Sequence, residues 1–272
     1  MRIGIFVSFI LCSALLASPV SAQDVFGKPG KVDSGRTEEA VTTAKAALLA
    51  MGGADALAGV GACVAEGTYS VYFPVQDSGH FKWINSGDQF RYEYTGEKGA
   101  ITTYLSNSGR PAEMTNDAVN YLPPNFIYTM ADAPHLLGVR LLRHFNDLSG
   151  SFGLADSKKL TDKYKNTFVL RMAYPDADDS AKRLVERDWV IDAGSGLTNQ
   201  LRIIAPGYPN ASIQTVTNYS YSGYRSFDGV MAPTQIKMFD RGSLVKLFQL
   251  NSLQCGATVD NSQFIVNGGA HE

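Results

Sequence analysis

Apolar residues follow a helical period in two stretches of the chain and a period of two in most of the rest. The first helical stretch covers residues 37–51, where the apolar positions are Val41, Ala44, Leu48 and Met51. Thr37 can cap this helix, because its hydroxyl can accept a hydrogen bond from a free backbone N–H. Gly52 and Gly53 can end it, because glycine adopts the left-handed conformation of a helix C-terminus without strain. We therefore predict an amphipathic helix over residues 37–51.

The second helical stretch has a broader apolar face. Pro134 suits the first position of a helix, and the residues that follow on one face are Leu137, Leu141, Phe145 and Leu148. This face is widened by Leu136, Val139 and Leu142. A stripe this wide exceeds that of a surface helix, so we expect a helix from 134 to 148 that is covered on more than one side.

The period of two predicts about ten or eleven strands. The first four are expected at 64–73, 79–85, 89–95 and 100–106, and residues 112–124 have the pattern of an irregular segment. The later strands are expected at 168–174, 184–192, 197–204, 213–221, 234–239, 244–252 and 263–266.

The order of these elements limits the fold class. The first four strands are joined by short turns, which favours hairpins, and helices do not alternate with strands, which argues against a parallel βαβ arrangement. A large antiparallel sheet has to close, fold over or be covered on one face. We predict a mainly β protein with two helical insertions (α+β), a curved antiparallel sheet or incomplete β-barrel wrapped around the helices.

The first 22 residues have the three regions of a secretory signal peptide. Arg2 gives a positive start, residues 3–17 are almost continuously apolar, and Val20-Ser21-Ala22 supplies small residues for cleavage. The apolar run is shorter than the roughly 20 residues of a membrane-spanning helix. We expect a periplasmic protein with a flexible leader at 23–36, a single half-barrel domain at 37–267 and a tail at 268–272.

The charge of the remaining chain is small. Without residues 1–22 it has 23 basic and 26 acidic residues and a net charge of −3. This gives no electrostatic reason to expect nucleic acid as a partner. No later stretch of the sequence has the length and apolarity of a transmembrane segment.

Motifs of common enzymes and metal sites are missing from the sequence. His135 and His144 are nine residues apart, which excludes the paired helical histidines of metalloproteases, and there is no Cys-x-x-Cys. The Gly-Ser-Gly piece at 194–196 joins two predicted strands, unlike a nucleophile elbow. The carboxylates that could pair as acid and base are Glu66, Glu93 and Glu186, all on polar strand faces. We expect no catalytic residue, metal or cofactor, with a hydrolase as the remote alternative.

Two cysteines, Cys63 and Cys255, remain once the expected signal peptide at 1–22 is removed. An oxidising compartment permits a disulfide between them, which would stabilise the fold by about 3–5 kcal/mol in the chain-entropy model. Two buried thiols are the alternative, because the sequence does not fix the separation of their Cα atoms.

Aromatic residues occupy alternating positions in several predicted strands. They are Phe81, Trp83, Phe90, Tyr92, Tyr94, Phe168, Tyr174 and Trp189. A cavity and an ordinary β core require the same alternation, because aromatic residues are favoured in strands in any case. The pattern alone favours the ordinary core.

Several sequence pieces, in their order along the chain, resemble a known family. The helix ends in LLAMGGADAL, a strand opens with VAEGTYSVYF, and the later pieces are WVIDAGSGLTNQLRI and YSGYRSFDGVMAPTQIKMF. The nearest matches are D-x-x-[ST]-G-L at 192–197 and F-D-G-V-x-x-P at 227–233. The chain is similar to the periplasmic outer-membrane lipoprotein carriers, LolA-like and LolB-like, and most of all to their uncharacterised relatives.

This resemblance implies an incomplete antiparallel barrel with helices in its concave face and an apolar interior for the acyl chains of lipoproteins or other lipids. The helix at 134–148, with its broad apolar face, is the candidate lid over this interior. The carriers link barrel and lid through a buried arginine, whereas Arg91 and Arg171 are expected to point outward here. The ligand-binding residues we expect are Phe81, Trp83, Phe90, Tyr92, Leu137, Leu141, Phe168, Leu170, Met172, Trp189, Ile191, Leu201 and Ile203.

The first hypothesis is therefore a periplasmic carrier that holds lipid or lipoprotein acyl chains without catalysis. The alternative is an envelope protein–protein interaction or stress-sensing module on the same fold, without bound lipid. Such a module would show an exposed apolar patch and no closed cavity.

Overall fold

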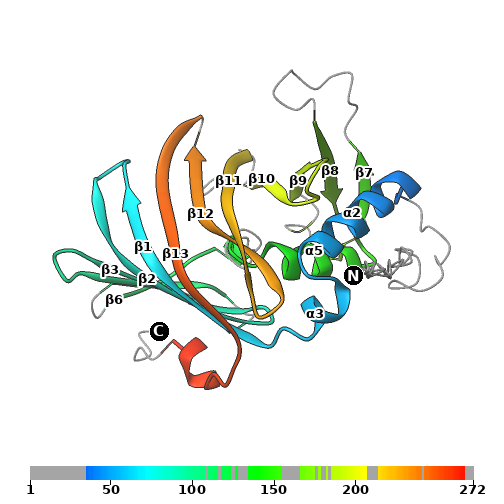
Figure 1. The fold of residues 1–272 in the computed structure, drawn as a ribbon. Helices are drawn as coiled ribbons and strands as arrows, with labels where there is room; N and C mark the ends of the chain where they lie inside the picture. The colour runs from blue at the N-terminus through cyan, green and yellow to red at the C-terminus, as the bar shows by residue number, and fades with distance from the viewer. Residues whose placement is uncertain are drawn as a thin grey trace, which may run out of the picture.

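The computed structural model describes residues 35–266, apart from 108–109, 116–117, 124–125, 128–133, 155–165, 175–176, 179–181, 183–184, 207–213 and 241. In this part of the chain, thirteen strands form one open antiparallel sheet (Figure 1). The strands of its first half are β1 (Ala62–Val71), β2 (Asp77–Ser86), β3 (Gln89–Gly96), β4 (Ile101–Ser106), β5 (Ala112–Thr115) and β6 (Ala118–Tyr121). Those of its second half are β7 (Ser151–Leu154), β8 (Thr167–Ala173), β9 (Glu186–Asp192), β10 (Thr198–Pro206), β11 (Gln214–Phe227), β12 (Val230–Asp240) and β13 (Ser243–Ala257).

The chain enters and leaves this sheet at its centre. Strands β1 to β6 run outward to one edge, and β7 to β13 return from the other edge until β13 pairs with β1. Figure 1 shows the long strands β1 and β13 side by side. Because β6 and β7 lie at opposite edges, the connection between them has to cross the sheet, and it carries a helix.

The three α-helices gather on the second half of the sheet. They are α2 (Glu38–Ala50), α3 (Ala54–Ala58) and α5 (Leu137–Asn146), with a 3₁₀ helix η5 (Asn261–Phe264) after β13. Helix α2 contacts β7 and β8, α5 contacts α2 and α3, and η5 contacts β3. In Figure 1, α2 and α5 lie beside β7 to β9. The fold class predicted from the sequence is confirmed: a mainly β, curved and open antiparallel sheet with helices.

The predicted first helix is confirmed as α2. The Thr37 hydroxyl accepts a hydrogen bond from the Ala40 backbone N–H at 3.3 Å, as expected of a capping residue. Its buried face includes Ala44 and Leu48, with Met51 just beyond the helix, whereas Val41 is only half-buried. Small residues on this face let the helix approach the sheet and α5 closely.

The second helix is shorter than predicted. It begins at Leu137, three residues after Pro134, and ends at Asn146. Leu148 is 77% exposed, so its assignment to the buried face is wrong. The chain leaves the helix at Asp147, which has an extended backbone, because it has to turn into the edge strand β7.

Three short elements differ from the predictions. Residues 112–124, expected to be irregular, contain the hairpin β5–β6, whose four-residue strands are too short to show a period. Strand β7 is likewise too short to be predicted and pairs with β8. The strand expected at 263–266 is instead η5, capped by the Asp260 carboxylate, which accepts from the Ser262 backbone N–H.

The two central strands are joined covalently. Cys63 of β1 and Cys255 of β13 are cross-strand partners and form a disulfide that links residues 192 positions apart. Among the described helices, none has the length and apolar character needed to cross a membrane. The expected signal peptide, nearly all of the leader and the tail lie outside the described residues.

Candidate functional site

The half of the sheet under the helices is packed with the protein's own side chains. All the predicted ligand-binding residues except Phe168 are buried in one core cluster. Eight of them belong to α5 and β8–β10, namely Leu137, Leu141, Leu170, Met172, Trp189, Ile191, Leu201 and Ile203. Here the ordinary-core interpretation holds, because α2 and α5 fill the space that a ligand would need.

A cavity of about 620 Å³ lies beside the central strands, away from α2. Among the described residues, its aromatic walls consist of Phe73, Trp83, Tyr92, Tyr94, Tyr104, Phe126, Tyr219 and Phe248. The aliphatic lining residues are Pro74, Pro134, Val216, Met238 and Val245, and the polar ones are Thr215, Thr217, Asp240 and Lys246. The cavity therefore lies between two groups of strands, β2 to β4 and β11 to β13.

The register of the sheet brings these side chains together. Trp83, Tyr92 and Tyr104 are successive cross-strand partners on β2, β3 and β4. Because cross-strand partners point to the same side of a sheet, they form one aromatic row. Phe248 of β13 meets this row, with its ring centroid 5.0 Å from that of Trp83.

The polar ends of the aromatic rings have partners within the protein. Trp83 Nε1 donates to the Tyr94 hydroxyl at 3.1 Å, and the Asn85 amide donates to the Tyr92 hydroxyl at 2.9 Å. The Tyr104 hydroxyl donates to the Glu113 carboxylate at 2.6 Å. Burial raises the pKa of the Tyr94 and Tyr104 hydroxyls, and the bond to Glu113 raises that of Tyr104 further. The tyrosines stay neutral and present mainly their ring surfaces to the cavity.

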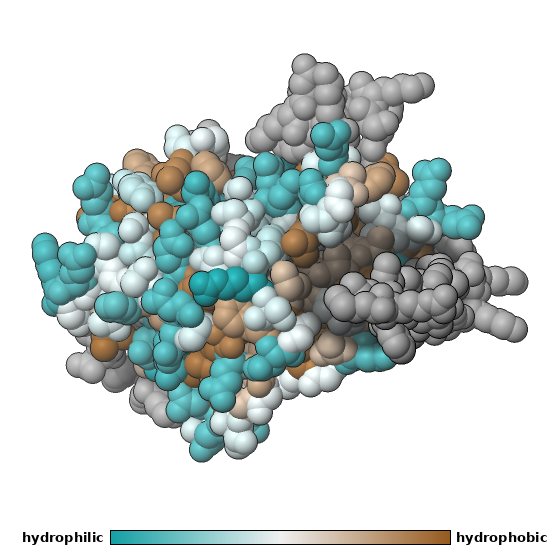
Figure 2. All heavy atoms as spheres, viewed as in Figure 1, coloured by the Kyte–Doolittle hydropathy of each residue, from teal (hydrophilic) through white to brown (hydrophobic). Residues whose placement is uncertain are grey.

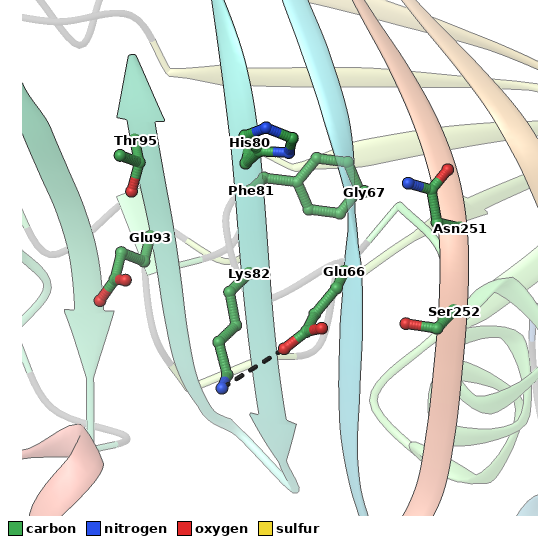
Figure 3. A pocket seen from close by; sticks show the side chains of 9 residues that line it. All are labelled: Glu66, Gly67, His80, Phe81, Lys82, Glu93, Thr95, Asn251 and Ser252. Carbon is green, nitrogen blue, oxygen red and sulfur yellow. Dashed lines mark ion pairs between the residues drawn. The ribbon is translucent and has the colours of Figure 1, made fainter. Parts of the chain in front are cut away.

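A second, polar pocket lies on the opposite face of the sheet. It has a volume of about 330 Å³ and is lined by Glu66, Gly67, His80, Phe81, Lys82, Glu93, Thr95, Asn251 and Ser252. Figure 3 shows the ion pair between Lys82 and Glu66, whose nitrogen and oxygen are 3.4 Å apart and well exposed. Glu93 pairs with Arg91 at 3.0 Å. With its carboxylates already paired to cations in water, this pocket is a solvated groove with little apolar enclosure.

Only part of the predicted ligand-binding set reaches the cavity. Trp83 and Tyr92 line it, and Phe81 stacks behind Trp83 with a ring separation of 4.1 Å. Phe90 is buried and stacks on Tyr92. Phe168 was expected inside, but it is 45% exposed and lies outside both the core and this lining. It is the second residue of β8, next to the end of the strand.

Sequence reasoning missed most of the lining. Tyr94 alternates with Tyr92 on β3, so the period of two could have added it. Tyr104 joins the row of Trp83 through the neighbouring strands β3 and β4. Tyr219, Met238 and Lys246 also alternate, but they reach the cavity only through pairing between strands distant in sequence. No local pattern carries that information.

Two buried ionisable residues, His135 and Arg140, lie near the start of α5. His135 is fully buried, and its ring packs on Trp83 with centroids 5.0 Å apart. Burial, together with nearby Arg140, lowers the pKa of His135 to about 3. Arg140 of α5 is itself buried, whereas Arg91 and Arg171 lie at the surface in ion pairs. Sequence analysis did not single out this buried arginine.

On the face shown in Figure 2, apolar residues appear in separate patches divided by polar ones. This is the ordinary appearance of a folded surface. Within the described residues, no three side chains among His, Cys, Asp and Glu gather closely enough to hold a metal ion.

Comparison with known proteins places the fold. No family model matches the sequence, and no curated protein matches it. A LolA superfamily protein from Nitrosomonas europaea matches with a TM-score of 0.51 at 11% identity, over 84% of this chain and 98% of that chain. The chain has a LolA-like fold. A DUF1329 family protein from Desulfovibrio piger matches at 10% identity with a TM-score of 0.50, over the same shares of the two chains.

The LolA-like fold confirms the resemblance seen in the sequence at the level of architecture. MucB, and MucB in its complex with MucA from Pseudomonas aeruginosa, also match at 12% identity, with TM-scores of 0.23 and 0.26. These two scores are too low to carry an argument.

Proposed function

We propose that the protein binds lipid or lipoprotein acyl chains in its aromatic cavity and carries them without catalysis. The observation that carries this proposal is the cavity of about 620 Å³ between β2–β4 and β11–β13. Its volume falls within the range of about 300–1,000 Å³ that is typical of ligand sites. Aromatic walls would shield an alkyl chain from water, at a gain of about 0.8 kcal/mol for each buried CH₂.

The proposed site differs from the one expected from sequence. The ligand contacts Trp83 and Tyr92, together with Tyr94, Tyr219 and Phe248, and it does not enter the packed core beneath α5. Leu137 and Leu141 pack among core residues, so helix α5 supports the fold in this proposal and does not cover the ligand. Phe73 and Pro74, which follow β1, form part of the rim.

We also propose that the protein works in the periplasm. The first 22 residues have the pattern of a secretory signal peptide. The Cys63–Cys255 disulfide supports the same compartment, because disulfides persist in oxidising surroundings.

Native mass spectrometry of protein purified gently from the periplasm tests this function. We expect co-purified lipid or acyl chains bound to the protein. Thr217→Trp should reduce the fraction of protein that carries lipid several-fold, because the indole ring would fill part of the cavity that the acyl chain occupies.

The matched control is Asn218→Trp, one residue along the same strand and on the opposite face of the sheet. It should retain the lipid. Protein free of lipid in every preparation, or equal retention by the two variants, would count against the carrier function.

One observation favours the alternative of an envelope interaction module. Tyr72, Phe73 and Val75 follow β1 and are 44%, 62% and 74% exposed. Neighbouring exposed apolar residues are typical of contact surfaces. A pull-down from periplasmic extract that returns one protein partner, together with lipid-free native spectra, would support this module over the carrier.

A further inference from the structure

A single lysine lies on the cavity side of the central strands. Lys246 of β13 is the cross-strand partner of Met238 on β12 and of Val71 on β1. Met238 in turn pairs with Tyr219 on β11. The four side chains form a row across the centre of the sheet, and three of them are apolar or aromatic.

Within the described part of the chain, Lys246 forms no ion pair. Its Nζ lies 5.9 Å from the centroid of the Tyr94 ring. The charged group that acts on it is Glu113 of β5, whose carboxylate already accepts the hydroxyl proton of Tyr104. By contrast, Lys82 and Lys182 each contact a carboxylate.

The surroundings of Lys246 favour an added negative charge. Burial among apolar groups disfavours the ammonium form and lowers the pKa of Lys246, while Glu113 partly opposes this effect. A carboxylate or phosphate against Nζ would form a charge-assisted hydrogen bond in place of the lost water. Asp240, the acidic residue of the cavity lining, is exposed at the end of β12.

The position of Lys246 sets the direction of the ligand. It pairs with the last residue of β1 and lies three residues after the start of β13, near the rim that includes Phe73 and Pro74. Phe248, two residues further along β13, is buried and packs against Trp83. A head group bound at Lys246 therefore directs the alkyl chain toward Phe248 and the aromatic row on β2–β4.

We infer that the cavity takes an anionic amphiphile, an alkyl chain with a carboxylate or phosphate head, and that Lys246 binds the head group. This inference rests on the proposed function and names the ligand class. A neutral chain would fill the same walls but leave the ammonium group without a counter-charge.

Displacement of N-phenyl-1-naphthylamine, an uncharged probe that fluoresces in apolar surroundings, tests the inference. Dodecanoate should displace the probe from the wild-type protein at about tenfold lower concentration than dodecan-1-ol does, a difference of about 1.4 kcal/mol, because its carboxylate accepts a charge-assisted hydrogen bond from Lys246. Lys246→Met should abolish the difference between the two ligands, and Lys246→Arg should retain it. Lys237→Met, on β12 with its side chain on the opposite face, is the control and should behave as wild type.

The possible outcomes separate the inference from the function on which it rests. Equal affinity for dodecanoate and dodecanol in the wild type, or an unchanged preference in Lys246→Met, overturns the inference but leaves lipid binding intact. Failure of both ligands to displace the probe removes the proposed function as well. Inorganic phosphate alone should leave probe and dodecanoate binding unchanged, and competition by phosphate would show a free-anion site instead. If Lys246→Met does not fold, loss of the preference in Lys246→Gln decides the question.

Discussion

Trp83 and His135 show how single residues separate the cavity from the core. Trp83 lines the cavity, and the His135 ring packs on it. Neither ring nitrogen of His135 has a hydrogen-bond partner among the described residues. A charged imidazole at this position would be buried without compensation, so the residue acts as a neutral aromatic wall.

Replacing His135 should change the pH dependence of stability. The unfolded chain binds a proton at His135 below a pKa of about 6.5, whereas the folded pKa is lowered to about 3. The contribution of neutral His135 to the free energy of unfolding is therefore fully present above pH 6.5 and is lost as the pH falls toward 3. In His135→Phe, the free energy of unfolding should fall about 2 kcal/mol less between pH 7 and pH 5 than in the wild type. Urea unfolding at a series of pH values measures this.

The control is His80→Gln, which changes an exposed histidine on the face of β2 that points away from the cavity. It should follow the wild-type curve. A parallel fall in stability for wild type and His135→Phe would mean that His135 is protonated in the folded protein.

At the scale of elements, Phe81 packs closely against β1 at a point where β13 has one extra residue. The pairing of β1 with β13 shifts between Glu66 and Gly67. A Cβ at Gly67 would lie 2.0 Å from the Gln249 carbonyl oxygen and 2.7 Å from the Phe81 ring. Only glycine leaves room for Phe81 to lie here, where it stacks on Trp83.

Gly67→Ala should therefore destabilise the fold by about 1–3 kcal/mol, because the backbone of β13 or the Phe81 ring has to move. The measurement is the urea midpoint, followed by probe binding to show whether the cavity also changes. Gly153→Ala, on β7 with open space around the new Cβ, is the matched control and should cost little. Equal stability of the two variants would refute the close packing at Gly67.

At the scale of the whole molecule, the fold depends on the pairing of its first and last strands. β1 and β13 hold the two halves of the sheet together, and the cavity lies between strands on both sides of this junction. The Cys63–Cys255 disulfide crosses the same junction. Loss of this pairing would separate β2–β4 from β11–β12 and open the cavity.

Removing the disulfide should lower stability without changing the fold. In protein expressed from Gln23, the double variant Cys63→Ala with Cys255→Ala should lose about 3–5 kcal/mol, because the bond closes a very long loop in the unfolded chain. Equilibrium unfolding measures the loss. The bond itself is checked on the wild-type protein by intact mass after denaturation and alkylation. We expect no alkyl groups to be added without reductant and two to be added with it, and alkylation without reductant would contradict the bond.

The sequence alone was enough to predict the fold class, because alternation along β1–β4 and β8–β13 is local and each long strand repeats it several times. The short strands β5, β6 and β7 were not predicted, because four residues are too few to show an alternating pattern. Helix α2 was predicted to within one residue at each end because its cap and glycines are encoded next to it.

The location of the cavity was decided only by the tertiary structure. Alternation shows which side chains share a face of one strand, and it assigned Trp83 and Trp189 alike to the interior. Helix α5 packs beside Trp189, with the His144 ring centroid 6.5 Å from that of Trp189, whereas Trp83 lines the cavity. Lys246 likewise joins the cavity only through pairing of β13 with β1 and β12. A local pattern fixes the direction of a side chain, but what lies opposite it depends on contacts between segments far apart in the chain.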